Sequence, residues 1–436
     1  MPPTGVRQKI ASYFEFEKRG TDFTTEAIAG LTTFLAMAYI IFVNPNVLAA
    51  AGMDKTGLIT ATCVVTALAT LLTGLVSKAP IAMAPGMGLN AFFAYTLVVG
   101  EGIPWETALG IVFLSGLFFF ALTVLGARRK LVEAIPRTLI SAMAVGIGLF
   151  ITFIGLVNLG VIVRNESTLI AAAPVTPTVA IGLAGFLVMV VLEMRGVRGA
   201  MIFGILTSTA LAIFSGYVEA PRAWVSAGFD FRALSFKLDI FGACQWGFLA
   251  AVFTLMFMDM FDSIGSLVAC CHQAKLTEPG GHIRGLDRLL GLDAIATMLG
   301  AVLGTSTTTT YVESAAGIEQ GGRTGFASLV TAGLFLLGLF FIPVIAIVPA
   351  YATAPALVLV GFYMMKEMKN VHFKDLEEGF PAFIIITMIA LSYSISTGLA
   401  FGFISFVVFK LIRWKWREIH PVMWVIFALS LLHFAL

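Results

Sequence analysis

Charged residues are scarce in this chain. Lysine, arginine, aspartate and glutamate together make up 12% of its 436 residues, whereas 59% are hydrophobic, and the mean hydropathy is +0.96. In a typical soluble domain about a quarter of the residues are charged. The apolar residues form long continuous runs, which are typical of membrane-spanning helices and not of the alternating strands of a membrane barrel. The sequence therefore predicts an all-α integral membrane protein.

Two further signals are absent, a cysteine framework and a cleavable leader. The four cysteines (Cys63, Cys244, Cys270 and Cys271) show no metal-binding or disulfide spacing, so we interpret them as packing residues. Residues 1–22 are polar and basic, unlike the apolar centre of a signal peptide, so we expect the first apolar run to be retained as a span. No cofactor, metal ion or nucleic-acid partner is expected.

The apolar runs predict about 14 transmembrane helices in two sets of seven, since a span needs about 20 apolar residues. In the first half the spans are expected at residues 27–48, 58–75, 81–99, 105–125, 139–159, 175–192 and 200–214. In the second half they are expected at residues 247–269, 289–303, 304–325, 326–348, 354–365, 381–396 and 399–412. The final run, 421–436, is barely long enough to span, and a position at the membrane interface is the alternative.

The positive charges of the loops support this count, because basic residues collect on the cytoplasmic side of membrane proteins. With the N-terminus inside, the cytoplasmic loops contain Lys78, Arg128, Arg129, Lys130, Arg137, Arg195, Arg198, Lys275, Arg284, Arg288, Arg323, Lys366, Lys369, Lys374, Lys410, Arg413, Lys415 and Arg417. The outside loops contain Lys55, Arg164 and a linker at 217–244 with three basic and three acidic residues. We therefore expect a multi-pass protein of the cell (inner) membrane with both termini in the cytoplasm.

Two of the expected spans, the third and the tenth, are broken. The stretch Gly304–Gly325, GTSTTTTYVESAAGIEQGGRTG, opens with β-branched threonines that favour an extended backbone, and Glu313 follows where a helix can start. In the first half, IAMAPGMGLN (81–90) is broken by a Pro-Gly pair and ends at Asn90, 223 residues before Glu313. Irregular backbone at membrane depth must be buried in protein or line a wet cavity. Because each half has an odd number of spans, the repeat must be inverted, and paired broken helices in inverted repeats indicate a transporter site.

Three carboxylates lie within these apolar segments, Asp259 and Asp262 in LMFMDMFDSIGSL and Glu313 in the tenth span. An ionisable residue at the bilayer centre costs roughly 2.5–3.5 kcal/mol on insertion scales and is functional by default. No lysine or arginine occurs at 247–269 or 289–322, so ion pairing within these segments is excluded. We predict substrate or proton roles for Glu313 and Asp262. For Asp259 we predict either a proton role or the orientation of its neighbour.

An amide and two aromatic rings are candidates to complete a binding site. Asn90 offers both a donor and an acceptor at a helix start, where an N-cap role is the alternative. Phe42 and Phe261 are candidates to stack on a flat ring, with packing as the alternative in a chain of 38 phenylalanines. Carboxylates, an amide and aromatic rings suit a neutral heteroaromatic solute with several N–H groups, whereas carboxylates would repel an inorganic anion.

At these residues the sequence resembles the AzgA-like purine permeases of the nucleobase–cation symporter (nucleobase–ascorbate transporter) superfamily. The resemblance covers nearly the whole chain and is carried by GLTTFLAMAYIIFVNPNVLAAAGM, APGMGLNAFF, MDMFDSIGSLV, GTSTTTTYVESAAGIEQGGRTG and LAFGFISFVVFKLI. It implies that Asp262, Glu313 and Asn90 match the family's acidic residues of spans eight and ten and its asparagine of span three. Relatives that carry uracil or xanthine have Glu at the position of Asp262, so the shorter side chain implies room for a bicyclic purine.

The resemblance also implies a core domain, a gate domain, a homodimer and elevator-like movement of the core past the gate. The implied divisions are a cytoplasmic N-terminus (1–24), core and gate parts of the first repeat (25–126 and 127–216), an extracellular or periplasmic linker (217–244), core and gate parts of the second repeat (245–348 and 349–413) and a C-terminal membrane-associated segment (414–436).

The predicted function is proton-coupled uptake of a purine nucleobase, hypoxanthine, guanine or adenine, with Na⁺ open as an alternative to H⁺. Asp262, Glu313 and Asp259 are the candidates for proton coupling. The alternatives are an anion exchanger of the same fold, which the carboxylates disfavour, and a passive channel. An intramembrane aspartyl protease is the alternative from another class, but its Tyr-Asp and Gly-x-Gly-Asp motifs do not occur in this sequence, so no enzyme activity is expected.

Overall fold

A computed structural model describes residues 5–126, 134–221, 223–226, 228–276, 283 and 285–435. In the first half its main helices are α3 (Phe23–Met37), α4 (Ile40–Ala49), α5 (Lys55–Leu72), α6 (Met87–Ala91), α7 (Trp105–Val124), α9 (Arg137–Leu159), α10 (Pro177–Met194) and α11 (Ala200–Phe214). In the second half they are α13 (Leu249–Gln273), α14 (Leu286–Leu303), α15 (Ser314–Glu319), α16 (Gly325–Gly338), α18 (Ala350–Met365), α19 (Leu376–Leu391), α20 (Ile395–Ile412) and α21 (Pro421–Ala435). Short helices α1 (Val6–Tyr13), α2 (Phe16–Arg19), α12 (Ile240–Ala243) and α17 (Ile342–Ala346) complete the set. The basic residues Arg128, Arg129, Lys130 and Arg284 lie outside the described residues.

The described residues contain eight helical stretches that are long and apolar enough to cross a membrane. These are Phe23–Ala49, Lys55–Ser77, Trp105–Val124, Arg137–Leu159, Pro177–Met194, Trp246–Gln273, Gly325–Ala346 and Ile395–Ile412. Three shorter apolar helices are Met87–Gly100, Ala200–Phe214 and Pro421–Phe434. The predicted integral membrane protein of the helical kind is therefore confirmed. The number of 14 spans and the seven-plus-seven inverted repeat stay predictions.

Local sequence signals explain where several helices begin. Asp22 accepts a hydrogen bond from the Thr25 amide (2.9 Å) at the start of α3, and Asp54 accepts one from the Gly57 amide (2.6 Å) at the start of α5. Ser394 caps α20 in the same way. The first amides of a helix have no partner within it, so such side chains satisfy groups that would otherwise be unpaired.

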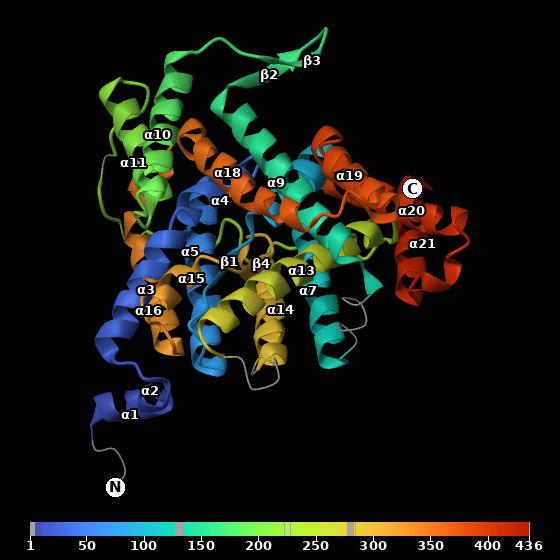
Figure 1. Ribbon diagram of the computed structural model, residues 1–436. Helices are drawn as coiled ribbons and strands as arrows, with labels where there is room; N and C mark the ends of the chain where they lie inside the picture. The colour runs from blue at the N-terminus through green and yellow to red at the C-terminus, as the bar shows by residue number, and fades with distance from the viewer. Residues whose placement is uncertain are drawn as a thin grey trace.

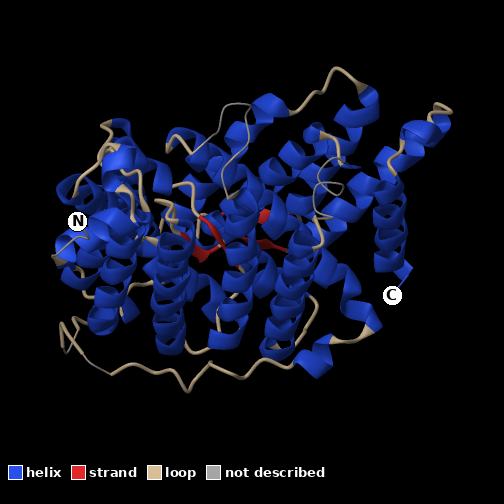
Figure 2. Cartoon of the chain, turned by 90° about the horizontal axis from the view of Figure 1, so that it is seen from below, coloured by secondary structure: helices blue, strands red, loops and turns tan. Residues whose placement is uncertain are grey.

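The centre of the molecule is a pair of short antiparallel strands, β1 (Met83–Pro85) and β4 (Thr308–Thr310). Met83 pairs with Thr310 and Pro85 with Thr308, and the Gly86 amide adds a hydrogen bond to the carbonyl of Thr307 (3.0 Å). Figures 1 and 2 show both strands surrounded by helices. Each strand thus satisfies the backbone of the other in the absence of water, which is the condition for extended chain at membrane depth.

Each strand leads into a helix, as the sequence predicts for the two broken segments. β1 is followed by α6, which continues with looser winding through Phe92–Gly100. β4 is followed after a turn by α15, with Glu313 as the residue before its first turn. Regular strand pairing covers Thr308–Thr310, the second half of the threonine run that the sequence predicts to be extended. A separate hairpin, β2 (Ile162–Asn165) with β3 (Leu169–Ala172), lies far from the centre at one end of the molecule (Figure 1).

The helices form two groups on either side of these strands. In one group α16 packs against α3 and α5, and α14 packs against α5 and α7. In the other group α9 packs against α18 and α19, and α19 packs against α20. A Cβ at Gly325 would collide with the backbone of Gly74, so glycine is required where α16 approaches the end of the second span. The division into a core and a gate domain, with its boundaries, stays a prediction.

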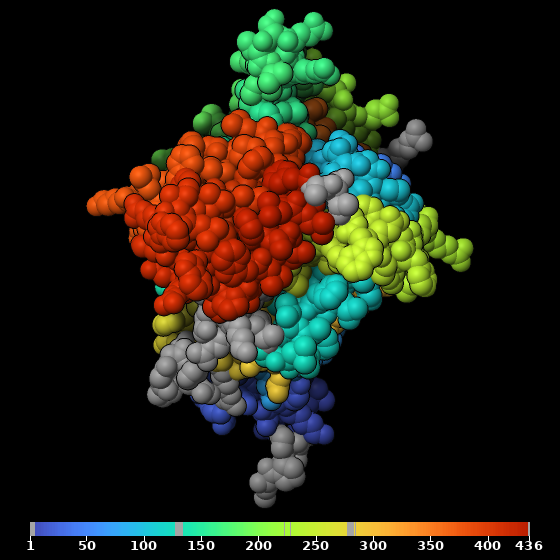
Figure 3. All heavy atoms as spheres, turned by 90° about the vertical axis from the view of Figure 1, so that its right-hand side faces the viewer, coloured from blue at the N-terminus to red at the C-terminus, as the bar shows by residue number. Residues whose placement is uncertain are grey.

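The C-terminal helix α21 packs mainly against α20 and touches α13. Figure 3 shows the C-terminal segments, coloured red and orange, covering a large part of one face of the molecule. α21 is shorter than the eight long apolar stretches, and both expected positions of this segment, across the membrane and at its interface, stay predictions.

Candidate functional site

A cavity of about 470 Å³ lies beside the paired strands. Its walls come from Gly86–Leu89 and Thr309–Glu313, which are the ends of the two broken segments, and from α9, α13 and α18. The volume falls within the range of roughly 300–1,000 Å³ that is common for small-molecule sites. The two broken segments therefore both contribute to the wall of one cavity, and its role as a binding site stays a prediction.

The carboxylates of Glu313 and Asp262 both line this cavity. Glu313 is half-buried, and the Tyr39 hydroxyl donates a hydrogen bond to its Oε1 atom (2.8 Å). Asp262 is exposed to the cavity on α13, on the same face as Gly265 and Ala269, which are exposed as well. Glu367 is a third carboxylate in the wall, and Asn370 donates a hydrogen bond to its Oε2 atom (2.7 Å). The described residues of the wall include no lysine or arginine, so these carboxylates can accept hydrogen bonds from a neutral polar solute or bind protons.

Phe261 also lines the cavity, next to Asp262, and its ring lies 4.5 Å from that of Phe257. Phe42 packs against the hydrophobic core and is not in the cavity wall. The structure therefore brings Glu313, Asp262 and Phe261 together and leaves Phe42 outside the site. A stacking role for Phe261 is possible in this arrangement and stays a prediction.

Asn90 lies in α6, where it is fully buried, and it is absent from the cavity wall. Its side-chain amide donates to Oδ1 of Asn44 (2.6 Å), and Asn44 donates in turn to Thr62 (2.7 Å) and Thr305 (3.1 Å). It does not cap α6, whose N-cap is Gly86. Through Asn44, Asn90 thus belongs to a hydrogen-bond network that connects the expected first, second and third spans with the tenth. Its Oδ1 atom has no hydrogen-bond partner among the described residues, and its binding role stays a prediction.

Asp259 points away from the cavity into the contact between α13 and α14, where it is buried. Thr297 of α14 donates to its Oδ2 atom (2.7 Å), and its Oδ1 atom has no partner among the described residues. Across the same contact Ser263 of α13 donates to Oδ2 of Asp293 on α14 (2.6 Å), and Thr310 of β4 approaches the other oxygen (3.4 Å). The arrangement is reciprocal. Each helix contributes one carboxylate, and the hydroxyl group one turn later on the same helix donates a hydrogen bond to the carboxylate of the other helix.

Sequence reasoning missed Asp293 and Tyr39. Asp293 lies in an apolar run without lysine or arginine, the same signal that singled out Asp259, so it was open to prediction. Tyr39 carries no such signal, because a tyrosine in an apolar run is common and its partner Glu313 lies in the other half of the chain. A second, much smaller cavity of about 30 Å³ lies between α13, α20 and α21 beside His433 and has room for little more than a water molecule.

Known proteins are similar to this chain in sequence, and solved structures are similar to it in fold. The chain is 41% identical over 440 residues to the guanine/hypoxanthine permease PbuG of Bacillus subtilis (strain 168), covering 98% of this chain and 99% of that protein. It is 37% identical over 421 residues to the adenine permease AdeQ of Escherichia coli (strain K12), covering 96% of this chain and 95% of that protein. The transmembrane domain of the cyanobacterium bicarbonate transporter BicA has a similar fold, with a TM-score of 0.64 at 15% identity over 86% of this chain and 97% of that one.

The match to a family is equally extensive. Residues 24–401 match the family described as the Permease family, and this range includes both broken segments and all the carboxylates of the site. The resemblance to AzgA-like purine permeases is confirmed by these relatives. The chain is a transporter, not an enzyme, and it belongs to the Permease family.

Proposed function

We propose that this protein takes up purine nucleobases across the cell membrane in symport with protons. The observation that carries the proposal is the central cavity, into which Glu313 and Asp262 present two carboxylates beside the ring of Phe261. A purine offers several N–H donors on a flat neutral ring, so it can donate to both carboxylates and stack on an aromatic face. Relatives named as adenine and guanine/hypoxanthine permeases support the same substrate class.

The carboxylates also weigh against the anion exchanger suggested by the bicarbonate transporter fold. An anion in the cavity would lie beside the carboxylates of Asp262, Glu313 and Glu367, with no lysine or arginine among the described residues of the wall to offset them. A protonated carboxylic acid, by contrast, costs far less to move through a low-dielectric region than a carboxylate. Proton binding at Asp262 or Glu313 would therefore neutralise the site before it crosses the membrane, with Asp259 as the third candidate and Na⁺ as the alternative ion.

In this mechanism the base binds from outside against Glu313 and Asp262 while one carboxylate is protonated. The core then moves past the gate and releases base and proton to the cytoplasm. The core comprises residues 25–126 and 245–348, and the gate comprises residues 127–216 and 349–413. The continuous pairing of β1 with β4 supports movement of the core as one body, because both halves of the site are hydrogen-bonded to each other. A homodimer held through the gate domains completes the proposal.

Uptake of radiolabelled adenine, guanine and hypoxanthine, measured in cells without their own purine permeases, tests this function. We expect accumulation against a gradient, its loss with a protonophore, and competition by purines but not by bicarbonate. Glu313→Ala should abolish uptake, while Glu319→Ala, at an exposed carboxylate of the same segment, should leave it unchanged. Uptake that survives Glu313→Ala would reject the site, and accumulation that survives the protonophore but requires Na⁺ would reject proton coupling.

A further inference from the structure

Tyr39 occupies an unusual position in the first span. It lies at the break between α3 and α4, it is 2% exposed, and it reaches the cavity wall. Its hydroxyl donates to Oε1 of Glu313 (2.8 Å). The two residues are 274 positions apart, so this hydrogen bond joins the first span of one half of the chain to the central carboxylate of the other half.

The surroundings of Glu313 restrict the carboxylate further. Tyr311 donates from its hydroxyl to the carbonyl of Pro85 (2.7 Å), and its amide donates to the carbonyl of Ala82 (3.0 Å). Ser314 accepts a hydrogen bond from the Ala82 amide (3.0 Å). Hydrogen bonds therefore hold the residues on either side of Glu313 against the segment of β1. Because its backbone is held in this way, Glu313 can change its orientation only by rotating its side chain.

We propose that Tyr39 is a positioning residue for substrate binding, which holds Oε1 of Glu313 so that Oε2 is presented to an N–H group of the purine. The proposal rests on the purine site proposed above and adds to it a residue outside the predicted set. When one oxygen of a carboxylate is held by a hydrogen bond, its other oxygen points in a fixed direction. The side chain then loses less conformational freedom when the ligand binds. Without the hydroxyl, Oε1 of Glu313 loses this hydrogen bond, and the side chain can rotate.

Tyr39→Phe is the variant that removes only this hydroxyl. We expect the Kd of the purified protein for its best-bound purine and the KM of uptake to rise about tenfold. A change of this size corresponds to the loss of one charge-assisted hydrogen bond. Vmax should change by less than about twofold. Tyr351→Phe is the matched control, because the Tyr351 hydroxyl is buried without a hydrogen-bond partner in the structure. It should change neither constant. Incorporation of 3-fluorotyrosine at position 39, which keeps the donor, should restore the wild-type values.

Infrared difference spectroscopy separates positioning from a general structural role. The carboxyl band of Glu313 is identified by its loss in Glu313→Gln, and we expect Tyr39→Phe to shift that band while Tyr351→Phe leaves it in place. A wild-type Kd in Tyr39→Phe, or a weakened Kd with an unshifted Glu313 band, would overturn the proposal. If the wild-type protein binds none of the purines, the proposed substrate class fails instead, and the band shift still reports whether Tyr39 holds Glu313.

Discussion

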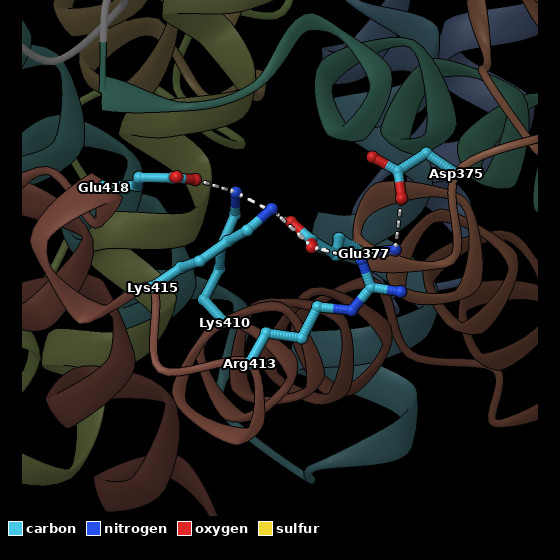
Figure 4. A network of polar contacts seen from close by, with 6 residues as sticks. All are labelled: Asp375, Glu377, Lys410, Arg413, Lys415 and Glu418. Atoms are coloured by element: carbon cyan, nitrogen blue, oxygen red, sulfur yellow. Dashed lines mark hydrogen bonds and ion pairs between the residues drawn. The ribbon is translucent and has the colours of Figure 1, made fainter.

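At the scale of single residues, buried carboxylates of the described chain differ in their partners, and two kinds contrast clearly. Glu377, near the start of α19, is surrounded by cations: Lys410 (3.0 Å), Arg413 (2.7 Å) and Lys415 (2.7 Å) all reach it, as Figure 4 shows. The side-chain donors to Asp259 and Asp293 among the described residues are the hydroxyl groups of Thr297, Ser263 and Thr310. Cations hold a carboxylate in its charged form, whereas hydroxyls allow it to gain or lose a proton at lower cost. The second kind is the one suited to a transport cycle.

Glu377 gives a prediction for the stability of the protein in acid. Hydrogen bonds from Lys415 and Lys410 lower the pKa of Glu377 from 4.5 to about 2. A carboxyl whose pKa falls on folding stabilises the folded state above its unfolded pKa, and this contribution is lost as the pH falls from about 4.5 towards 2. We expect Glu377→Gln to melt at a lower temperature than wild type at pH 7, with the difference shrinking below pH 4. Melting curves in detergent at pH 7, 5 and 3 measure this. An equal difference at all three values would contradict it.

Asp293 gives a prediction for transport. Asp293→Asn replaces an acceptor of two hydroxyl hydrogen bonds with a group that presents N–H to one of the donors, Ser263 or Thr310. Because Thr310 belongs to β4, the disturbance reaches the cavity wall directly. We expect uptake to fall about tenfold or more, as expected for the loss of one charge-assisted hydrogen bond. Initial rates of purine uptake, corrected for protein in the membrane, measure the effect, and Asp230→Asn in the exposed linker is the control. Wild-type rates would exclude Asp293 from the transport cycle.

At the scale of elements, the start of α16 depends on a residue of another helix. Glu26 of α3 is fully buried, and its carboxylate accepts hydrogen bonds from the amides of Arg323 (2.8 Å), Thr324 (3.1 Å) and Ala327 (3.2 Å). These amides have no partner within α16, so a negative group at this end satisfies them and complements the helix dipole. Glu26 therefore joins the first span to the segment that follows the candidate site.

Removal of this cap should destabilise the whole protein. Glu26→Ala leaves several buried amides unpaired, and we expect a loss of about 2 kcal/mol or more in the free energy of unfolding. The midpoint of thermal unfolding in detergent is the measurement, with Glu17→Ala at an exposed position of α2 as the control. If Glu26→Ala unfolds at the same midpoint temperature as Glu17→Ala, the prediction is contradicted, and water or a neighbouring side chain replaces the cap.

Much at this scale follows from the sequence alone. The two broken segments were predictable, since a Pro-Gly pair and a threonine run both disfavour helix at positions where the chain is otherwise apolar. Glu313 and Asp262 were predictable because an unpaired charge in an apolar span needs a reason. The register of β1 with β4 was not, because strands more than 200 residues apart give no local signal for their pairing. The hydrogen bond between Tyr39 and Glu313 depends on that register and was hidden for the same reason.

At the scale of the whole molecule, the proposed movement of core past gate can be stopped by a covalent link. Asn46 of α4 donates a hydrogen bond to Thr353 of α18 (3.3 Å), and these helices lie in the expected core and gate. In a background with exposed Cys244 replaced by serine, we expect the pair Asn46→Cys and Thr353→Cys, joined by a short thiol crosslinker, to stop uptake and retain purine binding. Reduction of a cleavable crosslinker should restore uptake, which is measured as the initial rate before and after treatment.

A matched pair within the core provides the control for this experiment. Gln273 of α13 donates to Glu319 of α15 (3.0 Å), and both lie in the expected second-repeat core. Crosslinking cysteines at these two positions should leave uptake unchanged, because the two helices are expected to move together. Full uptake after complete crosslinking of the first pair would show that α4 and α18 do not separate during transport.

The pairing of β1 with β4 also bears on how such a molecule can arise. A chain of half this length, carrying only Met83–Pro85 or only Thr308–Thr310, would expose unpaired backbone groups inside the bilayer at several kcal/mol each. It could become stable only beside a second chain that supplied the missing strand in antiparallel orientation. An ancestral half-gene would therefore encode an obligate pair, and joining two copies in one reading frame would guarantee that every strand is made together with its partner.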